Sequence, residues 1–296
     1  MRRLLVVVVT LATGAAGMVV VLPGSPASAQ EPQPTGDLDV VYRTVDGERV
    51  RADVYLPPEP GTDRPAVLLL HGGGWSGGDK EEVAWAGLAL ASLGYVAVAA
   101  NYRLAPEHPV PAAVDDVQAA VRWLRAPRQQ RRYGIDPTRI GAGGGSAGGH
   151  LVGMLAAMGH GRRDRGSRIA VGVSWSGPMD LREPAADVDH GRASPTGNGV
   201  PIFLGCKRRD CPAERALRAS PIHYVDPTDA PLFMAEAETD LIPLSWVKPM
   251  DRALTRAGVQ HDLVIEPGDG HSESLAPFVS EESVAILDSY LKSPAP

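Results

Sequence analysis

The chain has 296 residues, of which 44% are hydrophobic and 22% are charged, a composition that is ordinary for a globular protein. Its formal net charge is −6, which argues against nucleic acid or an anionic membrane surface as a partner. The sequence contains no long polar linker and no internal repeat. We therefore expect a single α/β domain, for which this length is sufficient.

The beginning of the chain resembles a secretory signal peptide. Two arginines precede an apolar stretch from Leu4 to Leu22, and a small-x-small cleavage site ends at Ala29. We expect residues 1–29 to be removed, which changes the formal charge to −6 − 2 = −8 because only two arginines are lost. The predicted product is secreted and has no stable membrane partner. The alternative is a membrane tether, since the uncleaved apolar run is nearly long enough to span a bilayer.

After a Pro-rich lead-in over 30–37, which is predicted to be disordered, strands and helices alternate through a domain expected at 38–293. The first two strands flank the turn Asp46-Gly47, a hairpin signal, and the second alternates apolar and polar residues like a strand at an antiparallel edge. Five later strands are continuous apolar runs, as in a parallel sheet covered on both faces, whereas the strand over 140–145 is nearly all glycine. The expected strands cover 39–42, 49–56, 66–71, 95–100, 140–145, 169–175, 231–235 and 261–266, and the expected helices cover 81–93, 111–125, 147–158, 244–257 and 281–291.

A serine nucleophile is predicted at Ser146. It stands at the centre of Gly-x-Ser-x-Gly, between an expected strand and an expected helix. Such a turn exposes the hydroxyl at a sharp elbow where a base can reach it, and glycines are needed because the turn crowds its own backbone. The motif is short, so its value depends on the residues that accompany it.

His271 is the best candidate for the base and Asp240 for the acid. His271 is the one histidine of eight that follows the last strand, although a surface-loop histidine is the plainer interpretation. Asp240 follows the preceding strand and would accept from the other ring nitrogen; Glu236 and Glu238 are its rivals. Asp269 is too close in sequence to His271 for the usual arrangement. The order Ser, Asp, His is the one that this elbow requires.

Backbone amides that could stabilise an oxyanion are supplied at two places. The run Gly72-Gly73-Gly74 follows a buried strand and His71, and its amides can turn into the site. The amide of Ala147, directly after the nucleophile, is another donor. The alternative interpretation is that the three glycines form only a flexible loop. Their position directly after a buried strand argues against this alternative.

The two cysteines, Cys206 and Cys211, form a close pair that reads as a disulfide in an exported chain. A zinc site needs about four ligands, and Asp210 is the only other local candidate. We therefore expect neither a metal nor an organic cofactor.

Five segments together resemble the α/β-hydrolase carboxylesterases, both the hormone-sensitive-lipase-like esterases and their feruloyl-esterase-like relatives, the BD-FAE group. The resemblance extends from about Val40 to Leu291, and the segments occur in the family's order. They are His71-Gly-Gly-Gly-Trp75, Asn101-Tyr-Arg-Leu-Ala-Pro-Glu-His108-Pro, Gly144-Gly-Ser146-Ala-Gly-Gly, Ala219-Ser-Pro-Ile222 and Asp240-Leu-Ile-Pro243.

The resemblance implies an α/β-hydrolase fold, with a mainly parallel eight-stranded sheet, helices on both faces and antiparallel N-terminal strands. It also implies an insertion over the site, expected at residues 180–230. By position it makes Ser146 the nucleophile, His271 the base and Asp240 the acid. The oxyanion hole would be formed by Gly73, Gly74 and Ala147.

The leading hypothesis is a secreted serine esterase that cleaves short-chain or acetyl esters through an acyl-enzyme. The substrate would be a small molecule or an ester carried by a polysaccharide. The same residues could instead hydrolyse amides, as arylformamidases and peptidases do in this fold. A non-catalytic binding module is a third possibility, which the presence of all three side chains disfavours.

Overall fold

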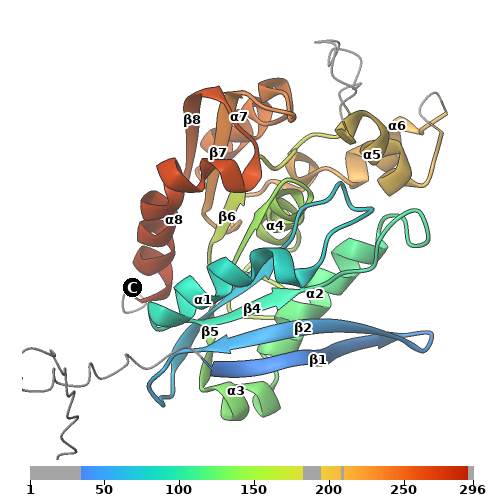
Figure 1. Cartoon of the computed structure of the whole chain (residues 1–296). Coiled ribbons are helices and arrows are strands. Elements are labelled where there is room, and N and C mark those ends of the chain that lie inside the picture. The colour runs from blue at the N-terminus through green and yellow to red at the C-terminus, as the bar shows by residue number, and fades with distance from the viewer. Residues whose placement is uncertain (1–34, 183–194, 208–209, 293–296) are drawn as a thin grey trace, which may run out of the picture. The chain divides into compact units, whose positions relative to one another are not determined.

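The computed structural model describes residues 35–182, 195–207 and 210–292. Its central feature is one sheet of eight strands in the order β1-β2-β4-β3-β5-β6-β7-β8. Strands β1, β2 and β4 pair antiparallel at one edge, and the pairs from β4 through β3 and β5 to β8 are all parallel. Figure 1 shows β1 and β2 at one end of the sheet and β7 and β8 at the other. This confirms the predicted sheet and its antiparallel edge.

Each strand and helix expected from the sequence is present, although most begin or end at a different residue than expected. The strands are β1 (Thr35–Val45), β2 (Glu48–Leu56), β3 (Arg64–Leu70), β4 (Val96–Ala100), β5 (Ile135–Gly145), β6 (Gly172–Trp175), β7 (Leu232–Thr239) and β8 (His261–Asp269). The helices are α1 (Ala84–Ser92), α2 (Ala112–Leu124), α3 (Pro127–Tyr133), α4 (Ala147–Ala157), α5 (Pro195–Leu204), α6 (Ala213–Arg218), α7 (Lys248–Ala257) and α8 (Ala276–Leu291), with short 3-10 turns η1 (Lys80–Val83), η3 (Pro221–Tyr224), η4 (Leu244–Trp246) and η5 (Ser272–Leu275).

Helices cover both faces of the sheet, as the alternation of strands and helices predicts. On one face, α1 and α8 bury residues such as Leu90 and Leu287 against the strands. On the other, α2, α4 and α7 bury residues such as Val117, Leu151 and Leu254. The central strands β3 and β4 are therefore apolar on both sides, which explains their uninterrupted hydrophobic runs, whereas β8 at the edge of the sheet is exposed or half-buried along its length.

The first strand begins earlier than expected, so the end of the predicted disordered lead-in over 30–37 is instead part of a strand. Residues 35–37 belong to β1, where Gly36 pairs with Tyr55 of β2. A Cβ atom on Gly36 would lie 1.8 Å from the carbonyl oxygen of Val54, so this pairing depends on glycine. The chain before Thr35, including the expected signal peptide, lies outside the described residues.

The glycine-rich end of β5 allows helix α4 to approach the sheet closely. A Cβ atom on Gly144 would lie 2.7 Å from the carbonyl oxygen of Leu70, and one on Gly148 would lie 2.1 Å from the same atom. Side chains at these two positions would force the helix away from β3 and β5. The glycines therefore fix where the start of α4 lies.

The predicted disulfide between Cys206 and Cys211 is present, with a Cα–Cα distance of 5.2 Å. It closes a small loop between α5 and α6. Within the described ranges, no helix is both long enough and apolar enough to cross a membrane.

Candidate active site

The candidate site lies at the edge of the sheet where parallel strands end. The carboxyl ends of β3, β5, β6, β7 and β8 meet there, and each is followed by polar or glycine residues. In open parallel sheets this edge is where ligands bind. Four of the loops that leave it begin with His71, Ser146, Ser176 and Asp240.

Ser146 occupies a strained turn between β5 and α4. Its backbone has φ 54° and ψ −120°, a conformation that non-glycine residues rarely adopt. The turn is held because the amide of Ser146 donates to the carbonyl of Trp175 at 2.8 Å. The side chain is nearly buried, with 8% of the residue exposed. This is the strand–turn–helix context that the Gly-x-Ser-x-Gly motif predicts.

Asp240 and His271 are joined by a hydrogen bond. The ring nitrogen Nδ1 of His271 lies 2.6 Å from Oδ1 of Asp240, whose side chain is fully buried. Because a carboxylate can only accept, Nδ1 carries the proton and Nε2 is left as the acceptor. The amide of Ile242 also donates to Oδ1, at 2.9 Å, and orients the carboxylate.

The loop of His271 packs directly against the elbow of Ser146. A Cβ atom on Gly145 would lie 1.9 Å from Oγ of Ser272, so the residues next to Ser146 and His271 are in close contact. Within the described part of the chain, the hydroxyl of Ser146 and the ring of His271 do not form a hydrogen bond with each other. The structure thus brings all three predicted side chains to one edge, with the hydrogen bond between Asp240 and His271 already made.

Ser176 is a site residue that the sequence analysis missed. It follows β6, and its hydroxyl donates to Oδ2 of Asp240 at 2.5 Å. The same hydroxyl accepts from the amide of Ser272 at 2.8 Å. Both serines have positive φ, 52° for Ser176 and 53° for Ser272. A polar residue directly after a parallel strand was the available signal.

The glycine loop after β3 passes over the elbow. A Cβ atom on Gly72 would lie 3.5 Å from Cβ of Ser146. Gly73 and Gly74 have φ of 92° and 59°, and a Cβ on Gly73 would lie 2.3 Å from the carbonyl oxygen of Gly77, so glycine is required there.

The amides expected to form the oxyanion hole have no acceptor among the described residues. Over the described ranges, no protein atom accepts a hydrogen bond from the backbone N–H of Gly73, Gly74 or Ala147. Ala147 is the first residue of α4, where a helix has no carbonyl to offer its leading amides. These donors are therefore free to receive a ligand oxygen.

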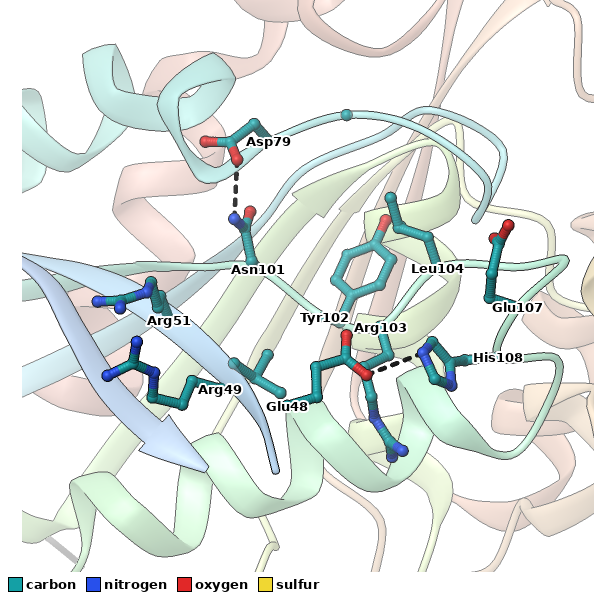
Figure 2. A pocket seen from close by; sticks show the side chains of 12 residues that line it. Glu48, Arg49, Arg51, Asp79, Asn101, Tyr102, Arg103, Leu104, Glu107 and His108 are labelled. Carbon is teal, nitrogen blue, oxygen red and sulfur yellow. Dashed lines mark hydrogen bonds and ion pairs between the residues drawn. The ribbon is translucent and has the colours of Figure 1, made fainter. Parts of the chain in front are cut away.

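The glycine loop is held at both ends. At its start, the hydroxyl of Tyr102 donates to the carbonyls of His71 and Gly72 at 2.9 and 3.1 Å. At its end, Asn101 donates from Nδ2 to Asp79 at 2.8 Å, a bond that Figure 2 shows. The pocket drawn there has a volume of about 360 Å³ and is lined by these anchoring residues; Ser146 does not line it.

The rival acids are placed elsewhere. Glu236 is fully buried on β7, and among the described residues its carboxyl oxygens have no hydrogen-bond partner of ordinary geometry. Burial raises the pKa of Glu236 well above its usual value, with the nearby Asp240 as the second cause and the backbone of Gly177 opposing. Glu238 and Asp269 are exposed. Neither these residues nor any other group of histidines, cysteines and acids in the described ranges could hold a metal ion.

The sheet order, the strained serine turn and the strand-end loops define an α/β hydrolase. A solved structure described as a truncated carbohydrate esterase from gut microbiota superimposes with a TM-score of 0.72 at 23% identity, covering 90% of this chain and 99% of that one. The BD-FAE family model matches residues 52–250. The chain belongs to the BD-FAE family.

Two curated relatives have enzymatic names. Over 136 residues the chain is 38% identical to arylacetamide deacetylase of Oryctolagus cuniculus, covering 44% of this chain and 33% of that protein. Over 219 residues it is 33% identical to the carboxylic ester hydrolase LipN of Mycobacterium tuberculosis, covering 72% of this chain and 55% of that protein. The matches thus span between a third and just over half of the relatives' lengths.

Proposed function

We propose that the protein is a serine carboxylic ester hydrolase, with Ser146 as nucleophile, His271 as general base and Asp240 as the acid that orients it. The observation that carries the proposal is the 2.6 Å bond between His271 and Asp240, on a loop that packs against the serine elbow. This bond fixes the tautomer that leaves Nε2 able to take a proton. A serine–histidine bond that forms only with substrate is common in empty sites.

The proposed reaction proceeds through an acyl-enzyme. Ser146 attacks the ester carbonyl while His271 takes the hydroxyl proton, and the tetrahedral oxyanion accepts hydrogen bonds from the amides of Gly73, Gly74 and Ala147. His271 then gives the proton to the leaving alcohol. Water, activated by the same imidazole, releases the acid and restores Ser146. The chemistry requires no metal or organic cofactor.

Short-chain or acetyl esters, on a small molecule or a polysaccharide, are the proposed substrates. Aromatic residues make up 5% of the chain, which gives little material for a broad lipid-binding surface. A relative is named a deacetylase, and a structural neighbour is described as a carbohydrate esterase. The insertion expected over 180–230 would shape the pocket: its helix α5 packs on the glycine loop, where a Cβ on Gly199 would lie 3.5 Å from the carbonyl of Gly74.

Amide hydrolysis is the second candidate function. It uses the same residues, and the name of the rabbit relative refers to an arylacetamide. A panel of p-nitrophenyl esters and acyl anilides separates the two. We expect faster ester turnover; faster turnover of the anilides would reverse the order.

The direct test of the proposal is covalent labelling. A fluorophosphonate probe should label the wild-type protein at Ser146 and should not label Ser146→Ala, which should also lose ester hydrolysis. Among p-nitrophenyl esters, acetate and butyrate should be cleaved fastest. Unlabelled, folded wild-type protein would favour a binding module, and undiminished hydrolysis by Ser146→Ala would overturn the assignment of the nucleophile.

We also propose that the protein is secreted after cleavage near Ala29. A disulfide between Cys206 and Cys211 suits an oxidising compartment. Expression of the full chain in a secreting bacterium, followed by mass spectrometry of the medium, tests this. A product that begins at Gln30 supports the proposal, and an intact N-terminus in the membrane fraction would replace it with the tethered alternative.

A further inference from the structure

The imidazole of His150 connects the nucleophile helix to the glycine loop. His150 lies four residues after Ser146 on α4, one turn further along, and is completely buried. The indole nitrogen Nε1 of Trp75, in the glycine loop, donates to Nδ1 of His150 at 3.2 Å. Nε2 of His150 lies 2.7 Å from the carbonyl oxygen of Ala219. Both ring nitrogens are thus engaged.

These contacts fix the protonation of His150. An indole N–H can only donate, so Nδ1 must accept; Nε2 then carries the proton and donates to Ala219. Burial lowers the pKa of His150 to about 4, which the bond to Ala219 only partly offsets. The ring is neutral near pH 7 and cannot take a proton from Ser146 at a nitrogen that is already occupied.

Trp75 occupies the turn that presents the glycine amides. Ser76 and Gly77 donate their amides to the carbonyl of Gly73 at 3.1 and 3.0 Å, and these bonds close a tight turn around Trp75. Trp75 itself has φ 58°, an unfavourable conformation for a bulky residue, so its surroundings must hold it there. The carbonyl of Trp75 accepts from the amide of Ala105 at 2.8 Å.

The side chain of Trp75 supplies the rest of that support. Trp75 is 2% exposed, and its indole stacks on Phe203 of α5, with ring centroids 4.6 Å apart and planes at 17°. It meets the ring of His150 edge-on at 5.1 Å. The bond to His150 is the only polar contact of the indole among the described residues, and it leads directly to the helix that begins at Ser146.

We infer that His150 is a positioning residue, which sets the glycine loop at a fixed distance from the nucleophile through its hydrogen bond with Trp75. This inference rests on the proposed function, because it concerns the amides that would stabilise the oxyanion. His150 touches no reacting atom; it acts through Trp75. An error of about 1 Å in the placement of catalytic groups can lower a rate about 100-fold, so one fixed bond between loop and helix has a large effect.

The inference is tested by substitutions of His150 that each preserve the hydrogen bond of only one ring nitrogen, either Nδ1 or Nε2. In His150→Asn the side-chain oxygen can take the place of Nδ1 and still accept from Trp75. In His150→Gln the amide can take the place of Nε2 and still donate to Ala219, while the bond to Trp75 is lost. Trp75→Phe removes the same bond from the other side. Trp123→Phe is the matched control. It makes the same substitution at a half-buried tryptophan that packs on Tyr133.

We expect Trp75→Phe and His150→Gln each to lower kcat by about 10- to 100-fold, with KM changed by less than about threefold. The double variant should be no slower than the slower single variant, because both remove one interaction. Affinity for an alkylboronic acid, whose tetrahedral adduct places an oxygen in the oxyanion hole, should fall in parallel. His150→Asn and Trp123→Phe should stay within about threefold of the wild type in kcat.

The outcomes separate this inference from the proposed function. If the wild-type protein neither hydrolyses esters nor reacts at Ser146 with a fluorophosphonate, the proposed function fails. If the wild type is active but Trp75→Phe and His150→Gln keep its kcat and its boronate affinity, only the positioning role fails. Equal losses in His150→Asn and His150→Gln that follow the melting temperature would also overturn it, because they would indicate a packing role.

Discussion

The hydroxyl of Ser176 donates to Oδ2 of Asp240 at 2.5 Å and accepts from the amide of Ser272 at 2.8 Å. One side chain therefore orients the proposed acid and holds the loop that carries His271. The strained backbone of Ser176, with φ 52°, indicates that the surrounding structure maintains this position at a cost.

Ser176→Ala should lower kcat by about tenfold, since a hydrogen bond to a charged group contributes about 1.5 kcal/mol. KM should change little. Steady-state kinetics on p-nitrophenyl acetate measure both quantities. Ser289→Ala, an exposed serine that bonds only within α8, is the matched control and should behave as the wild type. Unchanged kcat in Ser176→Ala would show that Asp240 needs no such support.

Asp240→Asn should lower kcat about 10³- to 10⁴-fold, because the amide stabilises neither the required tautomer of His271 nor its cation. Binding of substrate should be retained. The exposed Asp269→Asn lies two residues before His271 and should keep full activity. A loss in Asp269→Asn comparable to that in Asp240→Asn would reassign the acid.

Two glycines of β5 should respond differently to alanine. A Cβ on Gly145 would lie 1.9 Å from Oγ of Ser272, so Gly145→Ala must displace the loop of His271. We expect it to cost about 1–3 kcal/mol of unfolding free energy and to lower kcat more than about tenfold. A Cβ on Gly143 would meet only Leu69 at 3.6 Å and the carbonyl of Val173 at 3.9 Å, which are ordinary contacts.

Gly143→Ala should therefore stay within about 1 kcal/mol of the wild type and remain active. Urea unfolding and ester hydrolysis measure the two effects. Equal behaviour of the two variants would contradict the contact between Gly145 and Ser272.

Glu236 should make the protein less stable as the pH rises. Its pKa is raised in the folded state, chiefly by burial, so above its unfolded pKa the unfolded chain ionises while the native carboxyl stays neutral. The free energy of unfolding then falls with increasing pH until the folded pKa is reached. Glu236→Gln does not titrate, so its stability relative to the wild type should increase as the pH rises from the unfolded pKa of glutamate towards the raised pKa of the folded state.

Urea unfolding at several pH values measures this difference. Glu238 lies two residues further along β7 and is exposed. The free energy of unfolding of Glu238→Gln should therefore change with pH in parallel with that of the wild type. If the free energy of unfolding of Glu236→Gln also changes with pH in parallel with that of the wild type, Glu236 is ionised in the native protein.

The sheet could be predicted from the sequence because most of its parallel strands contain a continuous apolar run; the glycine-rich β5 is the exception. Helix α5 could not, since Gly199 and Pro201 within it oppose helix formation; burial of Phe203 against Trp75 outweighs that preference. Helix α3 is short and has few apolar residues, although Pro127 at its start and the left-handed Gly134 after it were usable signals.

The candidate site was predictable where a motif marks a position in the fold, as for Ser146, and where a strand end selects one residue, as for Asp240 and His271. For Ser176 the sequence shows only its position directly after β6; that the ends of β6 and β7 place its hydroxyl on Asp240 depends on the folded structure. No motif in the sequence marks a role for His150, and its bond to Trp75 joins residues 75 positions apart. Such links depend on tertiary contacts and leave no periodic pattern.

The aromatic partner of Trp75 comes from the long connection that begins with Ser176 after β6. Phe203 and the carbonyl of Ala219 both belong to the segment that connects β6 to β7, and their contacts are to Trp75 and His150. A replacement segment would have to keep Ser176 at its start and present an aromatic ring and a backbone acceptor at these two points. If the protein is the proposed esterase, exchange of the rest of this segment, by natural recombination or by laboratory grafting, should change substrate preference and leave the nucleophile in place.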